Sequence, residues 1–302
     1  MLKPNMPMID DAEGAAVPAG LSPVIDTHVH IFPHAIFSAI WKWFDENAYS
    51  IRYRMRATAV IDYLLAHGIS RLVLLQYAHK PGMARQLNRF MADQCAHYPG
   101  RVIGLATVFP GEEGAAALLQ EAFDAGLGGL KLHVHVQCFD MNADPMHELY
   151  ECCRKNAKPL LIHAGREPNC AAYKCDPYTL CSAERLAAVL RDYPDVKVCV
   201  PHLGIDETSA YRKLIERYDN LWLDTAMAIS AYLRGGSDID LARYRPDRIM
   251  YGSDFPNLPY AWDRELKKLA AAALDAETRE RILHGNATAF FDWPPAPSVV
   301  QR

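Results

Sequence analysis

Eight short apolar segments recur along the chain, and segments with the hydrophobic spacing of a helix lie between them. The strand-like segments are residues 24–31, 71–78, 102–109, 128–136, 159–165, 196–203, 221–228 and 249–256. The helix-like segments are residues 57–68, 83–97, 113–125, 144–157, 183–193, 208–218, 262–274 and 276–291. Apolar strands that alternate with helices are typical of a parallel sheet covered by helices on its outer face. Eight such units predict an α/β fold of the (β/α)₈ TIM-barrel type.

The length of 302 residues suits one barrel of this type. We place the barrel at residues 23–292, between a loose N-terminal arm (1–22) and a C-terminal tail (293–302). No glycine-rich phosphate-binding fingerprint follows the first strand, which disfavours a doubly wound dinucleotide-binding sheet. Residues 1–23 contain four prolines and three acidic residues where a signal peptide needs a continuous apolar region. We therefore expect a cytoplasmic protein.

The composition argues against large polyanionic partners. Half of the residues are hydrophobic and the formal net charge is −4, so the chain lacks the basic surface that binds nucleic acid or anionic membranes. No run of 18 apolar residues is long enough to span a membrane. We expect a small-molecule substrate as the main partner, and a homodimer is a secondary expectation because many such barrels pair through outer helices.

The eight cysteines form no CxxC pair. A chain of this size does not need a disulfide framework, so we expect buried free thiols in a reducing compartment. Cys170, Cys175 and Cys181 are the one group in which a thiolate metal site could lie, although their spacing is unlike that of a zinc module.

Imidazole and carboxylate side chains lie at the ends of the predicted strands, where barrels carry their active sites. His28 and His30, two residues apart on the first strand, point to the same face. The other strand-end residues are Lys131, His133, His135, His163, His202, Asp224 and Asp254. A single histidine is more often a core or surface residue than a ligand, but packing alone does not explain this repeated placement. The pattern therefore predicts a metal site at the mouth of the barrel.

These residues also stand in motifs that resemble a known family. The motifs are HxH at 28–30, PHLG at 201–204, GSDFP at 252–256 and ILHGNATAFF at 282–291, with a single histidine ending the fifth strand. Together they resemble the amidohydrolase superfamily, and within it the amidohydrolase-related (amidohydrolase 2) branch, over about residues 22 to 292. That branch includes hydrolases as well as the aminocarboxymuconate-semialdehyde and resorcylate-type decarboxylases.

The resemblance implies that His28, His30, His163 and Asp254 bind one divalent cation. It also implies that His202 and Asp254 are catalytic. Three neutral imidazoles and a carboxylate suit Zn²⁺, and Mn²⁺ or Fe²⁺ can substitute for it.

The fourth strand leaves alternatives open. In two-metal members of the superfamily a carboxylated lysine bridges the ions, and Lys131 lies on the corresponding strand. Lys131 precedes His133 by two residues, which places it deeper than a ligand at the mouth, so a substrate contact or a carboxylate partner is the alternative. We expect His133 to contact substrate, whereas His135 fits a surface loop equally well. Asp26 and Asn286 are expected to hold ligands or loops in place.

Two connecting segments are candidates for substrate binding. Residues 32–56 combine many aromatic side chains with Arg52, Arg54 and Arg56, which suits a planar or carboxylated ligand, or alternatively an amphipathic helix packed on the barrel. Residues 166–180 are too long for a plain turn and are expected to form a lid or an interface. Within them Arg166 is a candidate carboxylate contact, and His79 is a further candidate at the mouth.

The predicted reaction is hydrolysis of an amide, ester or lactone carbonyl in a small substrate, carboxylated or aromatic, by metal-activated water. Asp254 would accept the proton of the water and pass it to the leaving group, while His202 would polarise the carbonyl. The alternative is a non-oxidative decarboxylation of a carboxylated aromatic or muconate-like substrate at the same site. A metal-independent lactonase is a further alternative. A non-catalytic metal-binding barrel is disfavoured, because both proton-transfer residues are present.

Overall fold

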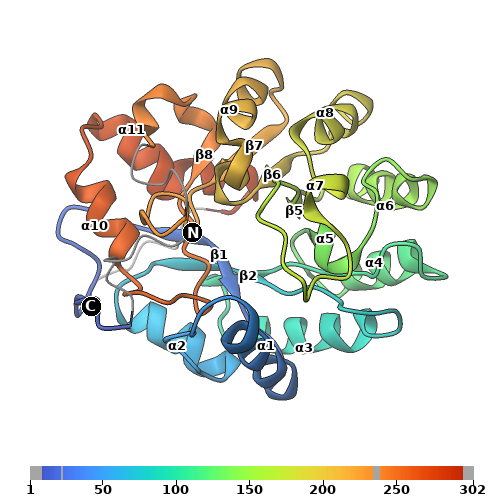
Figure 1. The fold of residues 1–302 in the computed structure, drawn as a ribbon, viewed down its shortest axis with the longest axis horizontal. Coiled ribbons are helices and arrows are strands. Elements are labelled where there is room, and N and C mark those ends of the chain that lie inside the picture. The colour runs from blue at the N-terminus through green and yellow to red at the C-terminus, as the bar shows by residue number, and fades with distance from the viewer. Residues whose placement is uncertain (1–8, 22, 234–238, 295–302) are drawn as a thin grey trace.

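The computed structural model describes residues 9–21, 23–233 and 239–294. Eight parallel strands lie in the interior with helices around them (Figure 1). The strands are β1 (Ile25–His30), β2 (Arg71–Leu75), β3 (Val102–Gly104), β4 (Leu130–His133), β5 (Leu160–His163), β6 (Val198–Val200), β7 (Leu221–Asp224) and β8 (Ile249–Met250). Each lies within a predicted strand segment, although all are shorter than predicted.

The strands pair in chain order, as β1-β2-β3 in one sheet and β4-β5-β6-β7-β8 in a second, and every pair is parallel. Two isolated parallel bridges join the sheets, Ala106 with Leu130 and Val29 with Phe255. The predicted TIM-barrel type of α/β fold is confirmed by this order, because it brings the carboxyl ends of all strands to one side of the molecule.

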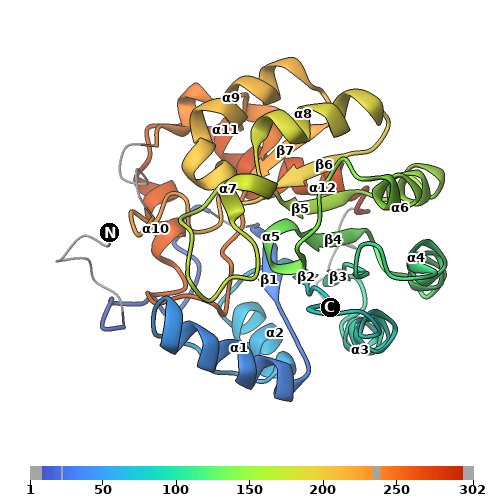
Figure 2. The same cartoon turned by 45° about the vertical axis from the view of Figure 1, so that its right-hand side comes forward.

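The longer helices lie outside the strands, which Figure 2 shows from a second direction. The helices are α1 (His34–Asn47), α2 (Ala57–Ala66), α3 (Ala84–Ala96), α4 (Ala115–Asp124), α5 (Val134–Gln137), α6 (Asp144–Lys155), α7 (Pro177–Leu180), α8 (Ala183–Asp192), α9 (Thr208–Arg217), α10 (Arg264–Ala271), α11 (Ala276–Glu280) and α12 (Asn286–Phe290). Among the described residues, no helix has both the length and the apolar character needed to cross a membrane.

Helix α12 covers the end of the barrel opposite to the mouth. Its Phe290 packs in one apolar cluster with inward-facing strand residues such as Ile25 and Trp222. The Asn286 side chain donates to the carbonyl of Ile249, at the start of β8, at 2.7 Å. This packing leaves the carboxyl ends of the strands as the open side, where the polar residues gather.

The fourth strand is shorter than predicted, so two histidines expected on it lie on different elements. Strand β4 ends at His133 and α5 begins at Val134, so His133 and His135 do not share a strand face. The Gln137 side chain accepts a hydrogen bond from the His133 backbone N–H at 2.8 Å and donates to the carbonyl of Val108 at 2.8 Å. These side-chain bonds satisfy buried backbone groups that a longer strand would have paired with its neighbour.

The described part of the N-terminal arm, residues 9–21, is held against the barrel. Asp11 pairs with Arg264 at 2.9 Å, Glu13 pairs with Arg52 at 3.0 Å, and the Gly14 carbonyl accepts from a tryptophan indole of the loop after β8. The expectation of a loose arm is therefore wrong for these residues, because polar groups of the segment after α1, of the loop after β8 and of the start of α10 bind it. Residues 1–8 and 22 of the arm and 295–302 of the tail lie outside the described residues.

One disulfide corrects the expectation of free thiols. Cys138, directly after α5, is bonded to Cys175 in the 166–180 segment, and the other six cysteines are free. The two residues are 37 positions apart in the sequence, but the long segment after β5 returns to the end of α5. With Cys175 in a disulfide, the thiolate group of Cys170, Cys175 and Cys181 loses one ligand.

Candidate metal centre

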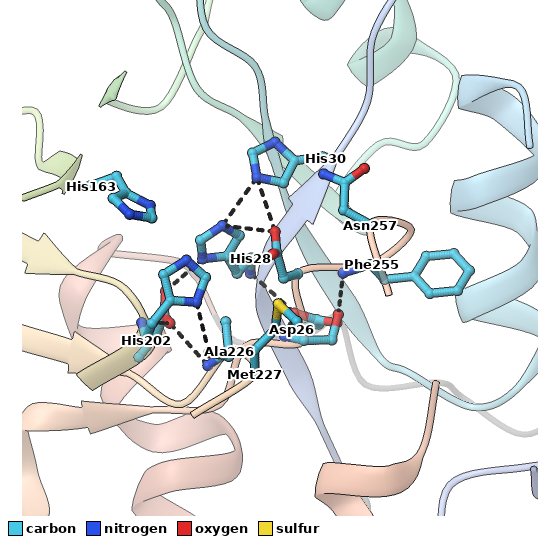
Figure 3. Close-up of polar contacts among 12 residues, drawn as sticks. Asp26, His28, His30, His163, His202, Ala226, Met227, Phe255 and Asn257 are labelled. Atoms are coloured by element: carbon cyan, nitrogen blue, oxygen red, sulfur yellow. Dashed lines mark hydrogen bonds and ion pairs between the residues drawn. The ribbon is translucent and has the colours of Figure 1, made fainter. Parts of the chain in front are cut away.

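His28 and His30 meet Asp254 at the mouth of the barrel. Figure 3 shows the rings of the two histidines close together. The two Nε2 atoms are 3.1 Å apart, and Asp254 Oδ1 lies 3.4 Å from the first and 3.2 Å from the second. Ligand bonds of about 2.0–2.1 Å in a tetrahedral zinc site would place ligand atoms about 3.3 Å apart, so this spacing fits one divalent cation. Burial lowers the pKa of both histidines well below the usual value, which leaves them neutral and able to coordinate.

Hydrogen bonds to Asp26 hold the two ligand-bearing segments together. Its Oδ1 accepts from the backbone N–H groups of His28 and Ser253, both at 3.0 Å, so one carboxylate joins β1 to the turn that carries Asp254. The Asp254 backbone has a left-handed φ of 70°, and its N–H donates to the His28 carbonyl at 2.8 Å. Burial raises the pKa of Asp254 to about 7.

Asp224, at the end of β7, orients two of the histidines. Its Oδ2 lies 2.9 Å from His28 Nδ1, and its Oδ1 accepts from the backbone N–H of His202 at 3.0 Å. Because a carboxylate accepts the Nδ1 proton, the lone pair of His28 is on Nε2, which faces His30 and Asp254. His28 is thus in the tautomer that a metal ligand needs.

His202 follows β6 and lies next to the three convergent groups. Its ring centroid is 5.1 Å from that of His28, and its Nδ1 is 2.7 Å from the carbonyl of Ala226. A carbonyl only accepts, so the ring proton is on Nδ1 and the lone pair is on Nε2. Burial lowers the pKa of His202, which keeps this neutral form.

His163 does not join this group in the structure. Its Nε2 lies 3.0 Å from Glu167 Oε2, and its ring stacks on His133 with centroids 4.0 Å apart. Figure 3 shows its ring to one side, with no contact drawn to His28 or His30. The four ligands predicted from the sequence are thus divided between two neighbouring clusters.

The second cluster contains a residue that the sequence analysis missed. Glu167 accepts from His135 Nε2 at 3.0 Å and from the Tyr173 hydroxyl at 2.6 Å, in addition to its contact with His163. Hydrogen bonds from His135 and His163 keep the pKa of Glu167 well below the usual value. His135 is buried, so the surface-loop alternative is wrong. The unusual length of the segment after β5 was the available signal in the sequence, and the residue predicted from it was Arg166 and not Glu167.

Both clusters line a cavity of about 840 Å³. Its wall is largely apolar and includes one face of α1, so the aromatic segment after β1 forms the amphipathic helix that was one of the two alternatives. The aromatic lining residues are Trp43, Phe44, Tyr49, Tyr77, Tyr173 and Tyr232. The cavity is therefore suited to a small ligand with a planar or apolar body.

The structure separates the remaining sequence candidates. His79 and His133 line the cavity, whereas Arg166 does not, since its Nε donates to the Cys181 carbonyl at 3.1 Å. Lys131 is fully buried without lining the cavity, and burial lowers its pKa to about 8. Among the described residues no arginine lines the cavity, and Lys80 and Lys174 supply its cationic side chains.

The fold is similar to several solved structures. A 5-carboxyvanillate decarboxylase from Novosphingobium aromaticivorans, complexed with manganese and 4-hydroxy-3-methoxy-5-nitrobenzoic acid, matches with a TM-score of 0.67 and 18% identity over 93% of this chain and 100% of that chain. A dihydroxybenzoic acid decarboxylase from a Polaromonas species, with manganese and 2-nitroresorcinol bound, matches with a TM-score of 0.67 and 19% identity over 89% of this chain and 97% of that chain. A probable 2-pyrone-4,6-dicarboxylic acid hydrolase from Acinetobacter baumannii, with citric acid bound, matches with a TM-score of 0.61 and 18% identity over 89% of this chain and 99% of that chain.

These similarities support the barrel fold. The similar structures include two decarboxylases and one probable hydrolase. The family model described as amidohydrolase matches residues 25–293, which is nearly the whole described barrel and includes both clusters. The chain belongs to the amidohydrolase family.

Proposed function

We propose that this protein is a metal-dependent hydrolase that opens an amide, ester or lactone carbonyl of a small substrate. The observation that carries the proposal is the convergence of His28, His30 and Asp254, whose donor atoms lie 3.1–3.4 Å apart. Zn²⁺ suits this donor set, and manganese, which two of the similar structures contain, suits it as well. His163, the fourth predicted ligand, is outside this group, and its Nε2 lies 3.0 Å from Glu167 Oε2 instead.

A bound divalent cation would supply Lewis acidity, which acidifies water and polarises a carbonyl. Asp254 is placed to take the proton of the attacking water and to return it to the leaving oxygen or nitrogen as the carbonyl bond breaks. Its Oδ1 faces His28 Nε2 and His30 Nε2 at 3.4 and 3.2 Å, so the carboxylate lies beside the position where a metal-held water would be activated.

The tautomer of His202 supports a different role from the one expected from the sequence. With its proton on Nδ1 and bonded to the Ala226 carbonyl, the neutral ring has no N–H on Nε2 to polarise a carbonyl. We infer that Nε2 accepts a hydrogen bond from the attacking water and orients it toward the substrate. Asp254 and His202 together then position one nucleophile and hold its proton.

The shape of the cavity favours an aromatic or otherwise planar substrate. The wall is largely apolar, so the body of the substrate is expected to be apolar, and a negatively charged substituent would have Lys80 or Lys174 as its partner. The aromatic wall also favours the second candidate, decarboxylation of a carboxylated aromatic acid, which is the chemistry named for two of the similar structures. In that reaction Asp254 would deliver a proton to the carbon that loses CO₂.

The test starts from the chelator-stripped full chain, reloaded separately with Zn²⁺, Mn²⁺ or Fe²⁺. Each form is assayed against aryl esters, lactones and amides for hydrolysis, and against hydroxylated benzoic acids for CO₂ release. We expect hydrolysis that is lost with the metal, restored by reloading, and unaffected in Asp195→Asn, which removes an exposed carboxylate far along the chain from the predicted ligands.

Three outcomes would contradict the proposal. Metal-dependent CO₂ release without hydrolysis would establish the second candidate. Turnover that persists undiminished in chelator would establish the metal-independent lactonase. A wild-type protein that binds no ion after reloading would remove the metal mechanism altogether.

A further inference from the structure

We propose that Glu265, on α10, is a positioning residue for His202. It acts by holding the peptide group between Ala226 and Met227 in one orientation. The inference rests on the proposed function, in which Nε2 of His202 accepts a hydrogen bond from the attacking water. Glu265 does not line the cavity, so it would act through the backbone and not by contact with the substrate.

One peptide group joins the two side chains. The Ala226 carbonyl lies 2.7 Å from His202 Nδ1 and accepts its hydrogen bond (Figure 3). The N–H of the same peptide belongs to Met227 and donates to Glu265 Oε2 at 3.0 Å. In a trans peptide the C=O and the N–H point in opposite directions, so the imidazole and the carboxyl group bind the two ends of one rigid plane. The orientation of this plane therefore links Glu265 to His202.

The carboxyl group of Glu265 is fully used in holding the loop after β7. The residue is 2% exposed, and its other oxygen, Oε1, accepts from the Ile229 N–H at 3.3 Å. Arg264, which precedes it on α10, donates from Nε to the Ser230 carbonyl at 2.7 Å. The start of α10 thus fixes three backbone groups of this loop. A buried N–H that loses its acceptor costs about 1–3 kcal/mol, so removal of the carboxyl group would favour another conformation of the loop.

The backbone itself favours a rotated peptide. Met227 has a left-handed φ of 56°, which is unfavourable for a residue with a branched or long side chain. Turning the Ala226–Met227 peptide over would return this φ to the common negative range. The same rotation would move the carbonyl away from His202 and bring the N–H toward it.

Few contacts oppose this rotation. The Ala226 carbonyl also accepts from the Ala228 N–H at 2.6 Å, but that N–H has a second acceptor in the Thr225 carbonyl at 2.8 Å. The rotation would therefore leave the Ala228 N–H bonded. Besides the His202 ring, the contact that holds the peptide in its present orientation is the bond to Glu265.

The orientation of the peptide determines the tautomer of His202. A carbonyl that faces Nδ1 requires the ring proton on Nδ1 and leaves the lone pair on Nε2. An N–H that faces Nδ1 would require the lone pair there and would place the proton on Nε2. Nε2 would then donate a hydrogen bond instead of accepting one from water. Glu265 thus keeps His202 in the form that the proposed function needs.

The experiment determines the tautomer of His202 by NMR of the ring nitrogens, because protonated and unprotonated nitrogens have well separated signals. The full-length protein is stripped with chelator, reloaded with Zn²⁺ and measured without substrate. The signals of His202 are identified by their loss in His202→Gln. The kcat of each variant is measured separately, on the substrate found in the hydrolysis screen.

The variants differ in the acceptors that they leave. Glu265→Leu removes both, whereas Glu265→Gln keeps one oxygen for the Met227 N–H. If circular dichroism shows that Glu265→Leu does not fold, Glu265→Asp takes its place, because its shorter side chain does not reach the peptide. Glu112→Leu is the matched control, since the Glu112 carboxyl group also accepts from two backbone N–H groups, those of Gly82 and Phe109, on the β2/β3 side of the barrel.

We expect the proton on Nδ1 in the wild type, in Glu265→Gln and in Glu112→Leu. In Glu265→Leu, or in Glu265→Asp where it replaces that variant, we expect an Nε2–H signal in place of the Nδ1–H signal or beside it. Zinc content should be unchanged, and kcat should fall by up to about 100-fold, as for a misplaced catalytic group. A purely structural role would lower stability without moving the ring proton.

Two results would overturn the inference. One is a wild type with the His202 proton on Nε2, and the other is a folded Glu265→Leu or Glu265→Asp variant that keeps the proton on Nδ1. Failure of the proposed function is separate from both. The expected tautomers together with no turnover of any substrate would support the control of His202 by Glu265 and contradict the proposed function.

Discussion

The two sides of the cavity present similar side chains on very different supports. On the β1/β8 side, His28 and His30 belong to one strand. Buried hydrogen bonds connect that strand to the turn after β8 through Asp26 and to the end of β7 through Asp224. On the β4/β5 side, the short helix α5 and the 166–180 segment supply part of the cluster, and a disulfide joins them. The first arrangement depends on the sheet, whereas the second depends on a loop.

This difference bears on how each side would respond to change. Ligands on strands are positioned by the backbone ladder and keep their geometry without an ion. Glu167 is positioned mainly by its own contacts to His135, His163 and Tyr173, so removing one contact leaves the others to hold it. We therefore expect changes on the β1/β8 side to affect turnover and changes on the β4/β5 side to affect stability.

The largest effect is expected from Asp254→Asn. The amide cannot accept a proton at neutral pH and is a weaker ligand, so turnover should fall by about 10²–10⁴-fold, the usual contribution of a positioned acid–base group. The measurement is kcat on the substrate found in the hydrolysis screen, with zinc content on the same sample. Asp195→Asn, which alters an exposed carboxylate, should match the wild type. A kcat within a few-fold of wild type would show that Asp254 does not handle the proton.

The next largest effect is on stability and is expected from a change on the β4/β5 side of the cavity. Cys138→Ser removes a cross-link between residues 37 positions apart, which should lower the free energy of unfolding by about 2–4 kcal/mol. Chemical unfolding without reductant measures this difference. The free thiol of Cys170 in the same segment gives the control, since Cys170→Ser leaves the disulfide intact.

Reductant provides the second arm of that experiment. Dithiothreitol should lower the stability of the wild type to that of Cys138→Ser and leave the variant unchanged. If the variant is as stable as the wild type before reduction, the 166–180 segment is held by its noncovalent contacts, and the contrast between the two sides becomes weaker.

The same contrast explains what the sequence could predict. The eight strands and the convergence of His28, His30 and Asp254 were predictable, because apolar periodicity and the HxH spacing act over a few residues, and the barrel brings all strand ends together. The position of His163 was only half predictable. Its place at the end of β5 was correct, but its partner depends on how the next segment folds back.

The elements that sequence reasoning missed depend on contacts between distant parts of the chain. Strand β4 ends at His133 because the Gln137 side chain reaches backbone groups of two other connections, and no local pattern indicates this. The Cys138–Cys175 disulfide and the binding of the arm through Asp11 are likewise made by residues far apart in sequence. Loop conformations of this kind follow from tertiary packing, whereas strands follow from local hydrophobic spacing.

A smaller effect is expected from Asp224→Asn. An asparagine can keep one oxygen for the backbone N–H of His202, but its amide group would then face His28 Nδ1 with a donor. The proton of His28 would then lie on Nε2, the atom that would face the cation. Zinc affinity at the site of His28, His30 and Asp254 should therefore fall by about 10–100-fold. Competition with a chromophoric chelator measures this affinity. Unchanged affinity would mean that the Asp224 contact does not set the tautomer of His28.

The smallest effect tests the loop-supported side. Tyr173→Phe removes one hydrogen bond to Glu167, whose contacts to His135 and His163 remain, so the free energy of unfolding should fall by only about 1 kcal/mol in chemical unfolding. Zinc affinity at the site of His28, His30 and Asp254 should not change. Tyr98→Phe is the control, because the Tyr98 hydroxyl also donates to a carboxylate, that of Asp62, but in an exposed contact away from the cavity. A loss as large as that of Cys138→Ser would show that the single bond from Tyr173 is what positions Glu167, and that its contacts to His135 and His163 do not hold the carboxylate without it.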